Sequence, residues 1–287
     1  MQGNEKFLGR VTSYAHKHAL WREGERILAA VSGGPDSLAL LLALKLLAVK
    51  EKINIGCCCV NHHLRAAAGK EAEFVESVCR EWNIPFILKE VDVQSAVRNG
   101  GSIETAARDL RYKALREAAR GGGYAKIAVA HHGDDQAETV LYHLLRGSGV
   151  TGLSGMKPIN EDIIRPFLCV SKNEIKDFLK DFSYVPCHDE SNDVEDAVRN
   201  RIRLSLVPEL ISYNPRVTES LRRTADIFRE EDLFMEEKAD VFISSCVEHD
   251  NDKCVFFIAY FLALHIALQR RVIRNICYMV AGRIPSF

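Results

Sequence analysis

The feature that most limits the possible folds is an alternation of short apolar runs with longer amphipathic segments. The apolar runs occupy residues 27–31, 53–60, 86–91, 126–130 and 163–167. The segments that follow them have helical spacing of apolar side chains and occupy residues 38–50, 70–82, 102–120, 134–146 and 172–182. Strands that alternate with helices form parallel sheets with helices on both faces. The sequence therefore predicts an α/β fold built on a doubly wound parallel sheet.

The pattern changes after Asp189. An acidic stretch, 189–196, precedes an arginine-rich segment and then helical patterns without a further strand–helix pair. We predict a domain boundary near Pro208, with the α/β domain over 1–208 and a smaller, mostly helical domain over 209–287. Within the second domain, residues 241–247 and 253–258 fit either two short strands or helix.

Composition describes an ordinary globular chain: 287 residues with 47% hydrophobic side chains can bury a sizeable core. The longest apolar run, 256–268, is shorter than the about 20 residues of a membrane-spanning helix and predicts a buried helix instead. The first ten residues mix acidic and basic side chains and lack the apolar segment of a secretory signal. We therefore expect a cytoplasmic protein.

The nine cysteines include no C-x-x-C pair. Cys57, Cys58 and Cys59 lie within an apolar run, where small hydrophobic side chains belong. We predict that they pack as reduced thiols and take no part in metal or redox chemistry.

A net charge of −1 gives no whole-chain indication of a nucleic-acid partner. Local stretches do. Residues 199–229 contain seven arginines, no lysine and three acids, and residues 258–287 contain four arginines and no acid. Both stretches are candidate phosphate-binding faces.

A loop that suits phosphate follows the first predicted strand and consists of Ser32, Gly33, Gly34, Pro35, Asp36 and Ser37. The glycines let backbone N–H groups approach anionic oxygens, the serines add hydroxyl donors, and the helix that follows contributes a positive N-terminus. Asp36 would repel phosphate unless a cation lay between them, which implies Mg²⁺ held at Asp36. The alternative is a glycine turn in which Asp36 or Ser37 only caps the helix.

A second glycine motif, formed by Gly147, Gly149 and Gly152, matches the dinucleotide fingerprint G-x-G-x-x-G. It follows a predicted helix rather than a strand. We therefore reject a dinucleotide site there.

Carboxylates gather after the fourth predicted strand, in residues 131–139. This segment and the phosphate loop should emerge at the same edge of the sheet and face each other. Asp135 and Glu138, three residues apart on one helix face, suit an ammonium group or a metal. The alternative is that Asp134 and Asp135 only cap the helix and complement its dipole. Zinc is disfavoured because neighbouring His131 and His132 would point in different directions.

With these motifs, the chain resembles the tRNA(Ile)-lysidine synthetase family of the PP-loop (N-type ATP pyrophosphatase) superfamily. The matching positions, in the family's order, are residues 32–37; 60–65; Glu104, Ala107, Arg108, Arg111 and Tyr112; 131–139; 146–149; and Asp189, Ser191 and Asn192 with 199–203.

The resemblance implies a two-step ligation. ATP adenylates the C2 oxygen of the wobble cytidine in a tRNA(Ile) with a CAU anticodon, and free lysine then displaces AMP to give lysidine. Residues 1–208 would be the catalytic domain and residues 209–287 a tRNA-contacting region. A homodimer is left open.

The resemblance also implies roles for individual residues, each with an alternative. Arg111 would clamp a phosphate, or form a surface salt bridge. Asp135 and Glu138 would position the lysine ammonium. His132 would assist proton removal, or make a structural hydrogen bond. Three further arginines would contact the anticodon region of the tRNA or the nucleotide, or would form a solvated helix face: Arg199, Arg201 and Arg203.

Other classes of protein share the phosphate loop. A tRNA thiolase would favour paired cysteines, an ammonia-using synthetase would use the same fold, and a non-catalytic adenine-nucleotide module would not need the carboxylates of residues 131–139.

Overall fold

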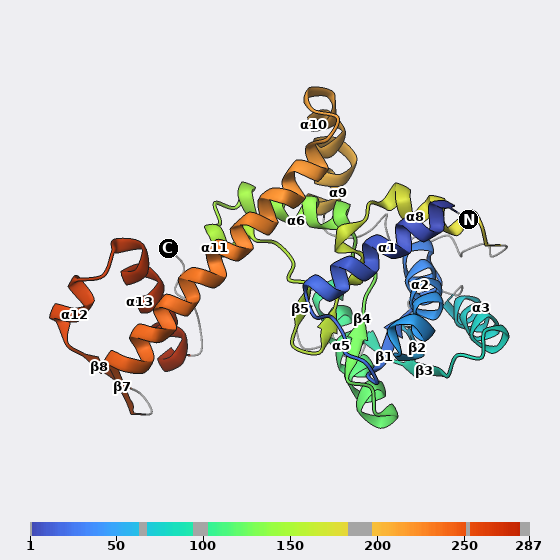
Figure 1. Cartoon of the computed structure of the whole chain (residues 1–287), viewed down its shortest axis with the longest axis horizontal. Helices are drawn as coiled ribbons and strands as arrows, with labels where there is room; N and C mark the ends of the chain where they lie inside the picture. The colour runs from blue at the N-terminus through green and yellow to red at the C-terminus, as the bar shows by residue number, and fades with distance from the viewer. Residues whose placement is uncertain (1, 63–67, 94–102, 183–196, 251–252, 282–287) are drawn as a thin grey trace. The chain divides into compact units, whose positions relative to one another are not determined.

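The computed structural model describes residues 2–62, 68–93, 103–182, 197–250 and 253–281 (Figure 1). The chain forms two compact units. Unit 1 comprises Met1–Tyr142 and Met156–Arg222, and unit 2 comprises His143–Gly155 and Arg223–Phe287. The domain boundary expected near Pro208, and the roles of the two domains, remain predictions.

Unit 1 contains a six-stranded sheet, and five of its strands coincide with the predicted apolar runs. Its strands, in chain order, are β1 (Arg26–Ala30), β2 (Asn54–Asn61), β3 (Phe86–Glu90), β4 (Lys126–Ala128), β5 (Ile159–Asn160) and β6 (Ile163–Ile164). The order across the sheet is β3-β2-β1-β4-β6-β5, and every pairing is parallel except that of β5 with β6. The α/β prediction is confirmed, while the antiparallel edge strand β5 is too short to leave a sequence pattern.

The strand order reverses direction at β1. The chain runs from β1 outward to β2 and β3, and then returns to pair β4 with the other side of β1. In an open α/β sheet, ligands bind beyond the carboxyl ends of the strands at such a reversal. The segments that follow β1 and β4 are the phosphate loop and residues 131–139.

Helices cover both faces of this sheet. They are α1 (Gln2–Lys17), α2 (Pro35–Glu51), α3 (Ala68–Glu81), α5 (Ile103–Gly122), α6 (Gly133–Leu145) and α8 (Lys172–Leu179). Alternate residues of β1 point to opposite faces, as in any strand. Ile27 and Ala29 pack with α1, α2, α3 and α8, whereas Leu28 packs with Leu115 of α5.

Cys57, Cys58 and Cys59 are buried free thiols of β2, as predicted. Burial raises the pKa of Cys58 and of Cys59 to about 12, so both stay protonated.

Helix α1 has no counterpart in the sequence predictions. Phe7, Val11 and Ala15 are buried along one side of it, at four-residue spacing. Phe7 stacks on Phe178 of α8 with ring centroids 4.5 Å apart, so α1 belongs to the core of unit 1.

Unit 2 contains most of α11 (Val217–Cys246), α7 (Val150–Leu153), the antiparallel pair β7 (Val247–Asp250) and β8 (Lys253–Phe256), α12 (Ile258–Leu262) and α13 (Ile266–Ala281). The open choice between strand and helix is thereby decided: α11 extends to Cys246, and both strands lie beyond it. The core of unit 2 is formed by Ala239, Phe242, Val272 and Ile276.

The prediction of one buried helix over residues 256–268 is wrong. A break between α12 and α13 interrupts the run, and its apolar side chains are largely exposed, with Phe257 at 75% and Leu262 at 63%. The core of unit 2 is small, and it takes from this run only Phe256, Phe261 and Leu264 as partly buried members. None of the helices in the described part of the chain is both long and apolar enough to cross a membrane.

Candidate active site

The phosphate loop is also the first turn of α2. The helix begins at Pro35, with Gly34 as its N-cap and proline at a position where no N–H is needed. Gly33 has a φ of +90°, a conformation that side-chain-bearing residues rarely adopt. The Ser32 N–H donates to Ser37 Oγ over 3.1 Å, and Ser37 Oγ donates to the Gly34 carbonyl over 3.0 Å. The loop is therefore pre-formed, with the helix N-terminus at its base.

The segment after β4 forms its own cap. The His132 N–H donates to Asp135 Oδ2 over 2.9 Å, and the Asp135 N–H donates to His132 Nδ1 over 3.4 Å. Asp134 Oδ2 accepts from the Lys172 N–H over 2.7 Å, which ties α6 to the start of α8. The helix-capping alternative thus describes part of what Asp134 and Asp135 do.

His132 joins this segment to the phosphate loop. Its Nε2 lies 3.7 Å from Asp36 Oδ2, while its Nδ1 lies 3.5 Å from Asp135 Oδ2. The two motifs therefore face each other, as expected from their positions at the strand ends.

Burial and charge act against each other on these groups. Burial would lower the pKa of His132, but the carboxylates of Asp135, Asp36 and Asp134 raise it above its usual value. Burial would raise the pKa of Asp36, but His132, Lys172 and Arg203 lower it. The cluster thus favours a protonated imidazole beside an ionised Asp36.

Asp36 also meets a requirement for holding a cation. Its Oδ1 is buried and has no hydrogen-bond partner among the described residues. Mg²⁺ takes oxygen ligands and keeps several waters, so one or two carboxylates suffice to hold it against phosphate. The unsatisfied oxygen beside the phosphate loop fits that ion.

The acidic pair of α6 already has a cationic partner. Arg203 Nε donates to Glu138 Oε1 over 2.8 Å, and its Nη2 donates to Glu138 Oε2 over 2.9 Å and to Asp135 Oδ1 over 3.3 Å. Arg203 lies in a π-helical turn, Ile202–Leu206, a local irregularity frequent at functional sites. Burial raises the pKa of Glu138, and Arg203 opposes that shift.

The other two arginines of this segment lie elsewhere. The guanidinium carbon of Arg199 is 5.9 Å from the centroid of the Tyr142 ring, and Arg201 is exposed. Only Arg203 reaches the carboxylates of α6. The motif positions 63–65, Asp189, Ser191 and Asn192, together with the side chain of Glu104, lie outside the described residues.

Arg111 lies on the first half of α5, with its guanidinium 5.8 Å from the centroid of the Tyr112 ring. It is exposed and forms no ion pair within the described ranges. Burial chiefly lowers the pKa of His62, which follows β2, and the charge of Arg111 lowers it further. Arg111 is therefore near the carboxyl edge of the sheet.

Sequence reasoning missed Arg165, which follows β6 and is 7% exposed. Its Nε donates to His131 Nδ1 over 3.3 Å. The signal was available, because Arg165 is the one charged residue inside the predicted apolar run 163–167, at the ligand-binding edge of the sheet.

Gly147 and Gly149 follow α6, and Gly152 lies within the short helix α7, so the glycines follow a helix, as expected. No strand precedes them, and the rejection of a dinucleotide site stands on that context.

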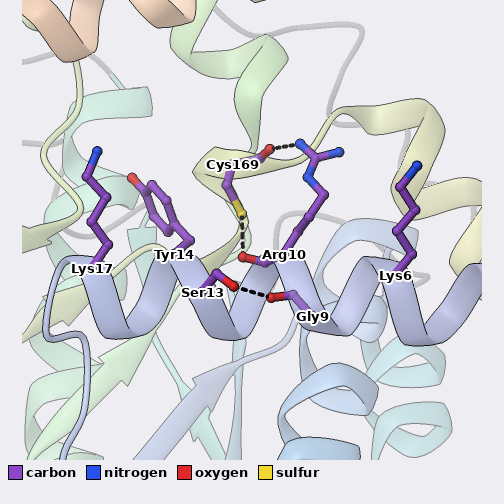
Figure 2. Close-up of a pocket in the computed structure, with 7 residues that line it drawn as sticks. All are labelled: Lys6, Gly9, Arg10, Ser13, Tyr14, Lys17 and Cys169. Carbon is purple, nitrogen blue, oxygen red and sulfur yellow. Dashed lines mark hydrogen bonds between the residues drawn. The ribbon is translucent and has the colours of Figure 1, made fainter.

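A shallow groove of about 510 Å³ lies along α1 rather than at this site (Figure 2). Arg10, at its centre, donates to the Cys169 carbonyl and pairs with Glu174. We give the groove no role in the chemistry, since none of its lining residues belongs to the phosphate loop or to α6.

Comparison with known proteins agrees with this geometry. Residues 5–210 match the family model described as a PP-loop domain. The fold and the loop therefore define a PP-loop protein.

Two curated relatives narrow the class. The tRNA(Ile)-lysidine synthase of Caldanaerobacter subterraneus is 36% identical over 95% of this chain and 59% of its own length. That of Petrotoga mobilis is 37% identical over 79% of this chain and 74% of its own. The chain belongs to the tRNA(Ile)-lysidine synthase family. The chain spans only 59–63% of the length of three curated relatives in this family, the Caldanaerobacter protein among them.

Among solved structures, the U34-tRNA thiolase NcsA from Methanococcus maripaludis, which carries a 4Fe–4S cluster, superimposes with a TM-score of 0.61. It covers 79% of this chain and 80% of its own, at 16% sequence identity. At that identity the likeness concerns the fold alone.

Proposed function

We propose that this protein uses ATP to join lysine to the C2 position of the wobble cytidine in a CAU-anticodon tRNA(Ile). The observation that carries the proposal is the placement of His132 between Asp36 of the phosphate loop and the carboxylates of α6. A nucleotide site and an amine-binding site then share one edge of the sheet.

In the first step, the C2 oxygen of the cytidine attacks the α-phosphorus of ATP and pyrophosphate leaves. Residues 32–37 hold the phosphates through backbone N–H groups and the N-terminus of α2. Asp36 would hold Mg²⁺, which would supply positive charge to neutralise the leaving pyrophosphate. Arg111 supplies a further cation near the edge.

In the second step, the ε-amine of lysine attacks C2, and AMP leaves with the former C2 oxygen. Asp135 and Glu138 bind the ammonium before it loses its proton. In the structure, the guanidinium of Arg203 contacts these carboxylates, which supports the proposal that the pair binds an organic cation. Lysine must therefore displace or share that contact.

His132 has two alternative roles that predict different pH profiles. As a base, it would act only in its neutral form, so its raised pKa would move the rising limb of the rate to higher pH. As a structural hydrogen-bond donor to Asp36 through Nε2, it would serve in the neutral and the protonated form alike, so the rate would not follow its titration.

The nearest rivals use the same loop with another nucleophile. Sulfur transfer needs a reactive thiol, whereas Cys58 and Cys59 are buried with pKa values raised to about 12. The acidic pair of α6 suits an amine better, and a nucleotide sensor would not need it. We expect the protein to act in the cytoplasm, where thiols stay reduced.

The test is to incubate the protein with ATP, Mg²⁺, labelled lysine and a CAU-anticodon tRNA(Ile) transcript, and then to weigh the wobble nucleoside after digestion. We expect lysidine, AMP and pyrophosphate in equal amounts. A transcript with uridine at the wobble position is the matched control. Absence of lysine from the nucleoside would contradict the proposal.

A further inference from the structure

Arg165 carries a buried positive charge without a negative partner. Its Nη1 donates to the Lys157 carbonyl over 2.8 Å and its Nε to His131 Nδ1 over 3.3 Å. Both acceptors are neutral, since burial above all lowers the pKa of His131 to about 3. Within the described residues no carboxylate forms an ion pair with Arg165. A buried charge of this kind is unfavourable until an opposite charge meets it.

Two further positive charges, those of Arg108 and Arg111, act on His131 together with Arg165. On the adjacent turns of α5, the guanidinium carbons of Arg108 and Arg111 lie 5.3 and 5.8 Å from the centroid of the Tyr112 ring. Both arginines are exposed, and neither pairs with a carboxylate in the part of the chain that the structure describes. Burial lowers the pKa of Arg165, and the positive charge of Arg108 lowers it further. Tyr112 raises the pKa of Arg165, in part through a hydrogen bond.

Three guanidinium groups thus converge at the carboxyl edge of the sheet, around His131 and Tyr112. The charge of Asp135 also reaches His131, but among the described residues no carboxylate forms an ion pair with any of the three arginines. Planar guanidinium groups bind phosphate bidentately, so this group of arginines is arranged for an anion. We propose that Arg108, Arg111 and Arg165 form a binding site for a phosphate group, distinct from the one over the loop of residues 32–37.

The position of this site favours an RNA phosphodiester over the phosphates of ATP. The phosphate loop follows β1, whereas Arg165 follows β6, which lies on the far side of β4 from β1. A second phosphate one or two strands away suits a polynucleotide whose target base enters beside the nucleotide. This assignment of the source rests on the proposed function; the phosphate site itself does not.

The test compares three variants of the whole chain. Arg108→Gln removes an exposed charge, and Arg165→Lys keeps the charge but loses the bidentate fork. Arg120→Gln is the matched control, because Arg120 is an exposed arginine at the other end of α5. Fluorescence anisotropy with a CAU anticodon stem-loop RNA and calorimetric titration with ATP measure the two ligands, and urea unfolding verifies the fold. If Arg165→Lys does not fold, Arg108→Gln carries the test.

We expect Arg108→Gln and Arg165→Lys to weaken RNA binding about tenfold at low salt and to reduce the slope of log affinity against log salt by about 1. ATP affinity and the Arg120→Gln variant should stay at wild-type values. Loss of ATP affinity with unchanged RNA binding would support a phosphate site at these arginines but would contradict its assignment to RNA, since the bound phosphate would then belong to ATP. Unchanged affinity for both ligands would overturn the site.

These outcomes are separable from failure of the proposed function. Wild-type protein that binds the stem-loop through these arginines but makes no lysidine contradicts the ligase proposal and supports the site. Wild-type protein without RNA affinity overturns the RNA assignment, and the ATP titration then decides whether the arginines bind phosphate.

Discussion

Arg203 and Glu138 form a bidentate ion pair across 65 residues of sequence, with both guanidinium–carboxylate distances below 3 Å. The Glu138 side chain is 8% exposed and that of Arg203 is 25% exposed. The pair therefore fastens the π-helical turn of residues 202–206 to α6, and it also places a cation where the lysine ammonium is proposed to bind.

Replacement of Arg203 by alanine should destabilise the fold, because it leaves the buried Glu138 carboxylate without its donors. We expect the free energy of unfolding to fall by about 2 kcal/mol in urea titrations. Arg201→Ala, an exposed neighbour, should change it by less than about 0.5 kcal/mol. Equal effects of the two substitutions would show that the pair contributes nothing to stability.

Asp135→Asn should separate the two substrates. Asp135 lies at the acidic pair but does not reach the phosphate loop directly, so the KM for lysine should rise about tenfold while the Kd for ATP changes less than about twofold. Steady-state kinetics and ATP titration measure the two constants. Collapse of ATP affinity instead would mean that this carboxylate belongs to the nucleotide site.

His132 should make stability depend on pH. Its pKa is raised in the folded protein, so the folded state holds the proton more tightly than an unfolded histidine, which titrates near about 6.5. The contribution of His132 is fully present below that pH and is lost as pH rises through the folded pKa. In Mg²⁺-free buffer, the difference in unfolding free energy between wild type and His132→Gln should therefore decline above about pH 6.5. A difference that grows with pH would reverse the assignment.

Gly33→Ala tests the backbone of the phosphate loop. At a φ of +90°, an alanine is strained by about 1–2 kcal/mol, and its Cβ would lie 3.4 Å from that of Glu71. We expect lower thermal stability and weaker ATP binding. Gly9→Ala, on α1, is a suitable control because its Cβ would meet no atom within 4 Å.

The thiols of β2 should resist alkylation. Cys57, Cys58 and Cys59 are buried, so iodoacetamide at neutral pH should modify them only after unfolding. Cys254 and Cys277 are partly exposed and serve as internal standards. Mass spectrometry of the labelled peptides reads both sets, and rapid labelling of Cys58 in the folded protein would contradict the packing described for β2.

The sheet and its flanking helices could be predicted because burial on both faces leaves continuous apolar runs, such as that of β2, and these do not depend on distant partners. Helix α1 was not predicted because it precedes the first strand, so no strand–helix alternation marks it. The prediction of a buried helix over residues 256–268 failed, because the hydrophobicity of a segment does not show whether the unit that contains it has a core large enough to bury it.

The candidate site, like the fold, has a part that could be predicted from the sequence and a part that could not. Residues 32–37 and 131–139 could be predicted because strand-end position fixes where they emerge. The contacts of Arg203 with Glu138, and the convergence of Arg165 with Arg108, depend on side chains brought together from separate elements. No local pattern encodes such pairings.

The parallel pairing of β1 with β4 joins Ile27 to Lys126 and Leu28 to Ile127. About a hundred residues must be ordered or looped out before these two strands meet, which makes this a slow, late event in folding. Asp36 and His132 lie beyond the ends of those strands, so their contact should mature only when that long-range pairing forms. A nascent chain that has not yet emerged past β4 would carry the phosphate loop in isolation and be unable to hold a nucleotide against its acidic partner.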